Sequence, residues 1–371
     1  MKHRLVHLDC LRGLAALLVV VEHLRAFLFV PFAQLKAPGI LAKGFYLVTG
    51  LGHQAVMIFF VLSGYLVGGS VITALQTGKW SWREYLLRRM SRLWVVLIPA
   101  LLLTLLWDKL GYAHAPTGYE GAYREIYNSG PTPAGPADWS LTSFFGNFFF
   151  LQTILVPCFG TNSPLWSLAN EFWYYLLFPM GLTIFVTGKW SDRVIALILV
   201  AGIVSFLPKS ILLGGVIWLL GALIFFLKRK DSIRAVVNHP ALLILGILLT
   251  IGTLLASRIG HMGEGADLAI GMSCTVLVAG LAARVSSSHL YGMISAGVSE
   301  ISYTLYLVHF PLLAYLFFVL FQGRQVTPTP MTSLWFLGGL GLTIVYSVVI
   351  WWLFERNTDR FRKWIHSRIF N

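Results

Sequence analysis

The chain has 371 residues, of which 57% are hydrophobic and 12% are charged, and its mean hydropathy is +0.75. These values exclude an ordinary soluble globular protein and indicate a helical membrane protein with many spans. The formal net charge of +13 does not indicate nucleic-acid binding, because that function needs a solvated basic face, whereas basic residues in alternate loops orient membrane spans.

Apolar runs follow one another almost from end to end. We therefore expect an all-α, polytopic membrane protein with about ten transmembrane helices and a single domain, residues 1–371, without a soluble extracytoplasmic domain. The start of the chain resembles a signal sequence, but Arg12 interrupts the apolar run, so we expect a retained first span. The predicted spans are 8–30, 45–70, 91–110, 165–187, 194–208, 211–227, 240–257, 267–284, 301–322 and 333–354.

Lysine and arginine residues are unevenly distributed between the loops. With both termini in the cytoplasm, 19 of the 28 Lys and Arg residues lie on the inner side, eight lie on the outer side, and Arg12 lies within the membrane. Inner loops of membrane proteins are enriched in these residues. The sequence therefore predicts that both termini are cytoplasmic.

The first span carries ionisable side chains that a bilayer disfavours: Arg12, Glu22, His23 and Arg25. Arg12 and His23 are eleven positions apart, which places them within about 20° of one helix face and roughly 16 Å apart along the axis. This pattern predicts a fixed cation and a titratable imidazole on one stripe. Alone, His23 is equally well explained as a buried neutral histidine bonded to a carbonyl or to Glu22.

Polar groups at the second and third spans have two interpretations each. Ser63 and Gly64 indicate either a backbone approached by substrate or close packing of two helices. Arg89 and Arg92 lie one helical turn apart, and two guanidinium groups on one face suit a ligand with several phosphates. The alternative for the arginines is an ordinary anchor at the inner membrane surface.

The longest outer connection runs from about 111 to 164. Its second half, 140–157, is apolar but short and broken by glycine and asparagine, so it predicts an interfacial or re-entrant segment and not an eleventh span. Glu171 follows, about 10 Å into the fourth span. A carboxylate at that depth needs a partner or a cavity, and either accepts protons or orients a histidine, or pairs with a cation.

Segments 240–257 and 267–284 are apolar and are predicted to be scaffold. Glycines at 246, 252, 271 and 280 suit close helix packing. His309 precedes Pro311. Because a proline lacks an N–H, it leaves a carbonyl one turn earlier without its helical partner, and a hydrogen bond from His309 could satisfy this carbonyl. Glu355, at the inner end of the last span, is predicted to form a structural ion pair with neighbouring arginines. The three cysteines, Cys10, Cys158 and Cys274, show no ligand spacing, so neither a metal site nor a disulfide is expected.

Taken together, these segments resemble integral-membrane acyltransferase family three, the family of bacterial O-antigen and exopolysaccharide O-acetylases. The resemblance covers residues 8 to 355 in the family's order. Two features differ from the family pattern: Glu22 directly precedes the histidine, and Asn170 stands where a second acidic residue is common. The matching stretches are LDCLRGLAALLVVVEH, FFVLSGYL, RRMSRLWVVLIP, SPLWSLANEFWYYLLFP and ISYTLYLVHFPLL.

The resemblance implies acyl transfer, in the simplest case acetyl transfer, from cytoplasmic acyl-CoA to a hydroxyl of a glycan or lipid-linked sugar. It implies a multi-pass protein of the bacterial inner membrane, with the lipid bilayer, acyl-CoA and the acceptor as partners, no nucleic acid, and no permanently bound cofactor or metal. The implied catalytic residues are His23 as general base, Glu171, which stabilises or orients the imidazole, and Arg12. The implied substrate-binding residues are Arg89, Arg92, Ser63 and His309.

Two other functions fit the same polar residues. A transporter or glycan exporter would use Arg12, Glu22, His23 and Glu171 as a polar pathway, although no inverted repeat supports it. A non-catalytic scaffold would need larger loops for docking. An acyl-histidine intermediate and direct transfer both stay open.

Overall fold

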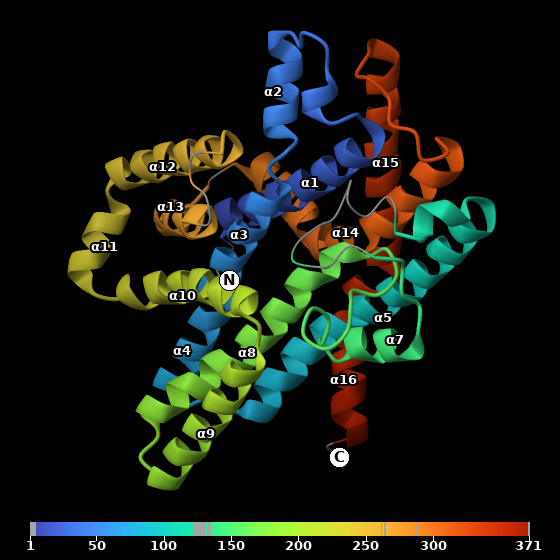
Figure 1. The fold of residues 1–371 in the computed structure, drawn as a ribbon. Helices are drawn as coiled ribbons and strands as arrows, with labels where there is room; N and C mark the ends of the chain where they lie inside the picture. Colours follow the sequence, from blue (N-terminus) through green and yellow to red (C-terminus); the bar gives the residue numbers. More distant parts are fainter. Residues whose placement is uncertain are drawn as a thin grey trace. The chain divides into compact units, whose positions relative to one another are not determined.

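The computed structural model describes residues 5–121, 131, 135–260, 262, 265–286 and 288–369. Helices make up most of these residues, and the described part of the chain has isolated β-bridges but no strand (Figure 1). The predicted all-α class is therefore confirmed. All three cysteines are free thiols, as the sequence predicts.

Among the described residues, six helical stretches are long and apolar enough to cross a membrane. All ten predicted spans overlap helices, but the count of ten and the cytoplasmic termini stay predictions. The first helix, α1 (Val6–Leu28), is not among the six, because every window of 18 residues within it holds at least three charged side chains. The six are Ile40–Gln76, Trp82–His114, Lys209–Leu227, Pro240–Arg258, His289–Leu320 and Pro330–Arg368.

The chain forms two compact units. Unit 1 comprises Met57–Ser81, Ser167–Ser287 and the described part of Met1–Leu8, and unit 2 comprises Asp9–Val56, Trp82–Trp166 and the described part of Ser288–Asn371. The expectation of a single domain stays a prediction.

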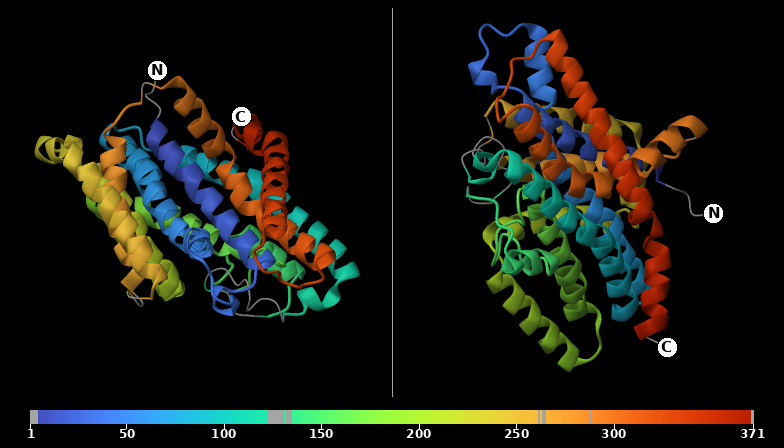
Figure 2. Two further views of the ribbon diagram at one scale, coloured as in Figure 1. Left: turned by 90° about the horizontal axis from the view of Figure 1, so that it is seen from above. Right: turned by 90° about the vertical axis from the view of Figure 1, so that its right-hand side faces the viewer.

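In unit 1 the helices pack in pairs. Helices α12 and α13 lie side by side, and α10 packs on α13 (Figure 2). Pro208 is the N-cap residue of α10 and lies two residues after the end of α9, so a tight turn joins the two helices. The helices of unit 1 are η2 (Gly64–Gly68), α4 (Gly69–Gln76), α8 (Trp166–Val186), α9 (Trp190–Phe206), α10 (Lys209–Leu227), α11 (Asp231–Asn238), α12 (Pro240–Arg258) and α13 (Ala266–Ala282).

In unit 2, α14 packs against both α5 and α15, and α16 packs against α5. Helix α1 belongs to this unit from Asp9 onward. Its further helices are η1 (Phe32–Gln34), α2 (Ile40–Val48), the start of α3 (Gly52–Ser63), α5 (Trp82–His114), η3 (Pro116–Tyr119), α7 (Leu141–Phe148), η4 (Ser163–Leu165), α14 (His289–Leu320), α15 (Pro330–Leu353), η6 (Glu355–Asn357) and α16 (Thr358–Ile369).

Glycines allow the closest helix contacts of unit 1, as expected. A Cβ added at Gly246 would lie 2.8 Å from the backbone of Leu277, and one at Gly280 would lie 3.1 Å from Leu243, so α12 and α13 touch through both. The prediction was wrong for Gly252, where an added Cβ would meet nothing within 4 Å.

Gly64 lies where two backbones cross. An added Cβ there would lie 1.8 Å from the carbonyl oxygen of Trp218, and one at Gly221 would lie 2.0 Å from that of Val61. Of the two interpretations of this glycine, close helix packing is therefore the one that the structure supports. The crossing falls where the helix widens into the π-helical turn η2.

The outer connection contains the short helix α7 and not a spanning helix, which confirms that 140–157 is no eleventh span. Residues 122–130 and 132–134 of this connection lie outside the described residues. The predicted span 45–70 lies within the helical stretch Ile40–Gln76, but this stretch is interrupted. The chain leaves helix α2 at Thr49, and α3 begins anew at Gly52.

Candidate active site

Two histidines from distant parts of the chain meet inside unit 2. Nδ1 of His23 on α1 lies 2.8 Å from Nε2 of His309 on α14. The two rings are stacked, with an angle of 7° between their planes, and Phe310 packs edge-on against His23. His23 is 7% exposed and His309 is fully buried. The pair is thus held by packing as well as by its hydrogen bond.

The hydrogen bonds of this pair determine where its protons lie. Nδ1 of His309 lies 2.9 Å from the carbonyl oxygen of Leu305, and a carbonyl can only accept, so Nδ1 carries a proton. Neither ring hydrogen bonds to a carboxylate among the described residues, and a buried cation would need one, so both rings are neutral. Nε2 of His309 is then an acceptor, and Nδ1 of His23 donates to it.

The consequence is a basic nitrogen on His23. Because Nδ1 of His23 holds the proton, the lone pair lies on Nε2, which has no hydrogen-bond partner among the described residues. When Nε2 accepts a proton, the bond from Nδ1 to His309 persists. Such an arrangement is chemically suited to accept a proton at Nε2 while His309 keeps the ring oriented.

The carbonyl that Pro311 leaves without a helical partner is not satisfied by His309. The carbonyl that Pro311 frees is that of Leu307, one turn earlier, and Nδ2 of Asn162 donates to it over 2.9 Å. Asn162 also donates to Thr104 over 3.1 Å and is fully buried. His309 therefore does not repair this carbonyl: its Nδ1 bonds the Leu305 carbonyl and its Nε2 faces His23.

Arg12 lies in a polar cluster at the start of α1. Its guanidinium donates to Oδ1 of Asp9 and to Oγ of Ser299, at 2.9 and 2.8 Å. Ser299, on α14, also donates to Asp9 over 3.1 Å. Arg12 is therefore anchored one turn after its carboxylate partner, and this cluster does not include His23.

Glu22, whose role the sequence leaves open, has structural contacts. Its Oε2 accepts from the backbone N–H of His53 over 3.0 Å, at the first turn of α3, where amide groups lack helical partners. Its Oε1 lies 4.0 Å from Arg25. A Cβ added at Gly52 would lie 2.1 Å from the Glu22 carboxylate, so this glycine makes room for it.

The two arginines of α5 have different surroundings. The guanidinium of Arg89 lies 5.8 Å from the ring of Tyr85, and Arg89 is partly buried. Arg92 is exposed and interacts electrostatically with Glu355, as does Arg12. Oε2 of Glu355 accepts from the amide and the hydroxyl of Thr304, at 3.2 and 2.6 Å. The arginine partners of Glu355 thus come from other helices.

Ser63 and Glu171 meet in unit 1. The Ser63 hydroxyl donates to Oε1 of Glu171 over 2.7 Å, and Tyr175 donates to the same oxygen. The indole N–H of Trp218 donates to Ser63 over 3.1 Å. Oε2 of Glu171 has no partner among the described residues. These four side chains, named here the Glu171 cluster, leave one carboxylate oxygen open for a hydroxyl ligand. An action of Glu171 on His23 stays a prediction.

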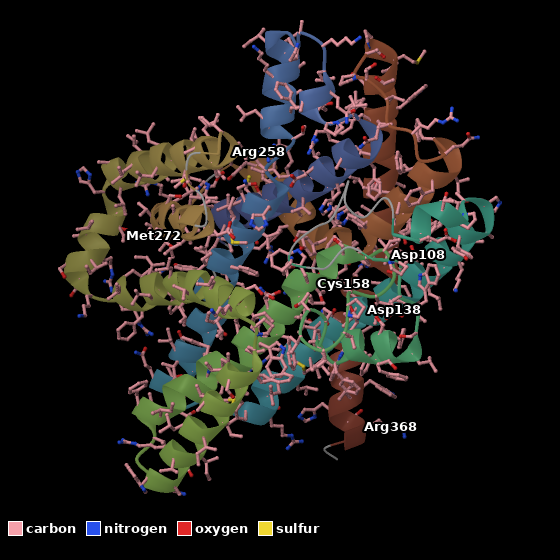
Figure 3. All side chains as sticks on the ribbon, in the orientation of Figure 1. Asp108, Asp138, Cys158, Arg258, Met272 and Arg368 are labelled. Atoms are coloured by element: carbon pink, nitrogen blue, oxygen red, sulfur yellow. The ribbon has the colours of Figure 1, made fainter. Side chains whose placement is uncertain are left out.

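A buried carboxylate that the sequence analysis missed anchors the outer connection. Asp108 is fully buried on α5 and accepts from Thr161 N–H, the Thr161 hydroxyl and the Trp139 indole, at 2.7, 2.6 and 2.9 Å (labelled in Figure 3). Gly160, with φ +57°, keeps this approach open. Burial, with Asp108 nearby, raises the pKa of Tyr119 far above its usual range. The sequence did contain a signal for this site, because an aspartate amid the apolar residues of the predicted span 91–110 needs a specific partner.

Comparisons with known proteins place this geometry in context. The model of a protein family described as an acyltransferase domain, Acyl_transf_3, matches residues 5–352. An uncharacterized protein of Haemophilus influenzae is 28% identical over 129 residues, which are 34% of this chain and 47% of the relative. The chain thus spans about half the length of the curated relative that it matches. No solved structure matches it.

Proposed function

The chain belongs to acyltransferase family 3 and is a multi-pass membrane protein, and on this basis we propose that it transfers an acyl group from cytoplasmic acyl-CoA to a hydroxyl group of a glycan or lipid-linked sugar. The acyl group is acetyl in the simplest case, which makes the enzyme an O-acetyltransferase. Its place is the bacterial inner membrane. The observation that carries the mechanism is the basic Nε2 of His23, fixed by the bond to His309.

In the proposed reaction His23 is the general base. Nε2 of His23 removes the proton of the acceptor hydroxyl while its oxygen attacks the thioester carbonyl carbon. A carbon–oxygen bond forms, the carbon–sulfur bond breaks, and the proton passes from His23 to the sulfur of the leaving CoA. The products are the acyl ester and free CoA, and His23 returns to its neutral form.

His309 is a positioning residue in this scheme. Its Nε2 accepts from Nδ1 of His23 in the neutral and in the protonated state, so the imidazole does not need to reorient during the reaction. The Leu305 carbonyl holds His309 in turn. Fixed orientation of a base is worth a large part of its catalytic effect, because the lone pair has to face the reacting proton.

Substrate binding is proposed at two places. Arg89 and Arg92 bind phosphate groups of CoA, since a guanidinium fork matches phosphate oxygens, and Arg92 interacts electrostatically with Glu355. Arg12 contributes positive charge and is held by Asp9 and Ser299. In unit 1, the open Oε2 of Glu171 and the Ser63 hydroxyl bind hydroxyl groups of the acceptor.

Release of CoA tests the proposal against the transporter alternative. Purified protein in vesicles is incubated with acetyl-CoA and a glycolipid extract from the host strain that lacks the protein, and free thiol is measured. We expect thiol release that requires both the extract and His23. Movement of glycan or protons across the vesicle membrane without thiol release would instead favour a transporter.

A further inference from the structure

Two apolar cavities lie against α10 in unit 1. One, of about 360 Å³, is lined by α8, α9 and α10, and the other, of about 460 Å³, is lined by α4, α8 and α10. Each volume falls in the range of small-molecule sites. The two cavities share the side chains of Phe178, Leu182, Val216 and Leu219. We name these adjoining cavities the α10 groove.

The α10 groove adjoins hydroxyl-binding groups. Trp218 lines the first cavity, and its indole N–H donates to Ser63, which in turn donates to Glu171. The same side chain is thus a wall of the groove and a member of the Glu171 cluster. Ser63, Glu171 and Tyr175 line neither cavity, so Trp218 is the side chain that links the groove to the cluster.

We propose that the α10 groove holds the hydrocarbon chain of an uncharged lipid acceptor, with a hydroxyl of that lipid at Ser63 and Glu171. This inference rests on the proposed acyl transfer, and it deepens that function by naming the class of acceptor. Helix α10 is one of the helices long and apolar enough to span a membrane, so its groove is supplied with lipid chains.

Charge argues for an uncharged acceptor and against CoA or a phosphate-linked lipid at this place. Among the described residues no Lys or Arg lines either cavity. Arg229 donates to Gln76, which lines the second cavity, whereas at the first cavity the carboxylate of Glu171 disfavours phosphate groups nearby. A glycolipid whose sugar is attached to its hydrocarbon chain without a phosphate has an apolar tail for the groove and places no negative charge near Glu171. The phosphates of the donor belong instead at the arginines of α5.

The groove orients the lipid more than it attracts it. Lipid chains in the bilayer are as apolar as the groove, so moving a chain into it gains little hydrophobic free energy. Packing along α8 and α10 and the polar contacts at the Glu171 cluster decide which lipid stays and how it lies. Filling the groove with a side chain therefore excludes the ligand by steric hindrance.

Photo-crosslinking with an uncharged glycolipid tests this inference. The probe is a long-chain alkyl glucoside with a diazirine in its alkyl chain, applied to the purified full-length protein, and mass spectrometry locates the labelled residues. Gly181 lines the first cavity, and a Cβ there would meet nothing within 4 Å, so Gly181→Phe fills the groove. Gly202→Phe on α9 is the matched control, since its Cβ is equally unhindered and it lines neither cavity.

We expect labels concentrated on α8 and α10, loss of these labels in Gly181→Phe, and wild-type labelling in Gly202→Phe. A phosphate-bearing probe with the same chain should label the groove weakly. Labels spread equally over α12, which is hardly buried, would mean bulk lipid only and would overturn the inference, even if Gly181→Phe failed to fold. A dimer that dissociates in Gly181→Phe would also overturn it, because a second copy would then cover the groove.

The His23→Ala variant separates this inference from the proposed function. Labelling of the groove needs no acyl transfer, so His23→Ala should label like the wild type. If labelling persists while thiol release is absent from every variant, the groove stands and the acyltransferase mechanism fails. If thiol release requires His23 but the groove is not labelled, the acyltransferase mechanism stands and the inference about the groove fails.

Discussion

At the scale of single residues, the proposed chemistry depends on one hydrogen bond, from Nδ1 of His23 to Nε2 of His309, which leaves Nε2 of His23 as the basic atom. His23 could be predicted as a base from its depth in an apolar span, where an ionisable group has a functional or structural partner. Its partner could not, because His309 is 286 positions away and no spacing rule connects two residues that only tertiary packing brings together. The structural role of Glu22 was hidden for the same reason, since it caps a helix that begins thirty residues later.

Replacement of His309 tests its positioning role. We expect His309→Leu to lower kcat about 100-fold, a typical loss for an impaired general base, with little change in the KM for acyl-CoA. His309→Gln keeps an acceptor near the position of Nε2 and should restore part of kcat. A purely structural role would instead lower the amount of folded protein in both variants, with equal specific activity in what remains.

Removal of the Asp108 carboxylate tests the anchor of the outer connection. Asp108→Ala leaves the amide and hydroxyl of Thr161 and the indole of Trp139 without their acceptor. Loss of three such bonds in a buried place costs about 3 kcal/mol or more in the free energy of unfolding. Thermal unfolding in detergent should show a clear drop in Tm.

The control for Asp108 is Asp138, an aspartate that lies in the outer connection itself (Figure 3). Its side chain accepts from the amide of Ser140 at an exposed position, so Asp138→Ala should cost at most about 1 kcal/mol. Equal losses of Tm in the two variants would contradict the anchoring role of Asp108.

At the scale of elements, periodicity and hydropathy predicted the helices, but the chain breaks where local contacts are specific. The interruption between α2 and α3 lies in a run of apolar residues and glycines. The Glu22 carboxylate accepts a hydrogen bond from a backbone N–H in the first turn of α3. Helices α5 and α14 begin earlier than predicted, at Trp82 and His289, and α5 also continues to His114.

The crossing of η2 and α10 gives a test at this scale. In Gly221→Ala the new methyl group would lie about 2.0 Å from the Val61 carbonyl oxygen, so the helices have to separate. Such overpacking typically costs about 1–3 kcal/mol, and we expect a lower Tm. Gly202→Ala, at an unhindered position in a helix, should keep or raise Tm. An unchanged Tm in Gly221→Ala would mean that the backbones are not in contact.

At the scale of the whole molecule, hydropathy and charge bias predicted a polytopic helical protein, and the all-helical class followed from them. What they could not supply is which helices pack together, since apolar faces of membrane helices look alike in sequence. The stretches that match the family contain the polar residues that the proposed function uses, and such residues are rare inside a membrane.

The orientation of the chain is open to direct measurement. Fusions of green fluorescent protein after Arg229 and after Arg368 should fluoresce, because the bias of basic residues predicts both positions in the cytoplasm. A fusion of alkaline phosphatase after Gly260 should be active, because this position is predicted on the outer side. The opposite pattern of activities would invert the topology and place the arginines of α5 away from cytoplasmic acyl-CoA.

The most direct measurement is mass spectrometry of glycans and glycolipids from cells that lack the protein and are complemented with wild type, His23→Ala or His309→Gln. Membrane levels of each variant are matched by immunoblot. The account predicts an acyl group with the wild type, none with His23→Ala, and a reduced amount with His309→Gln. Full acylation by a stably inserted His23→Ala protein would contradict it.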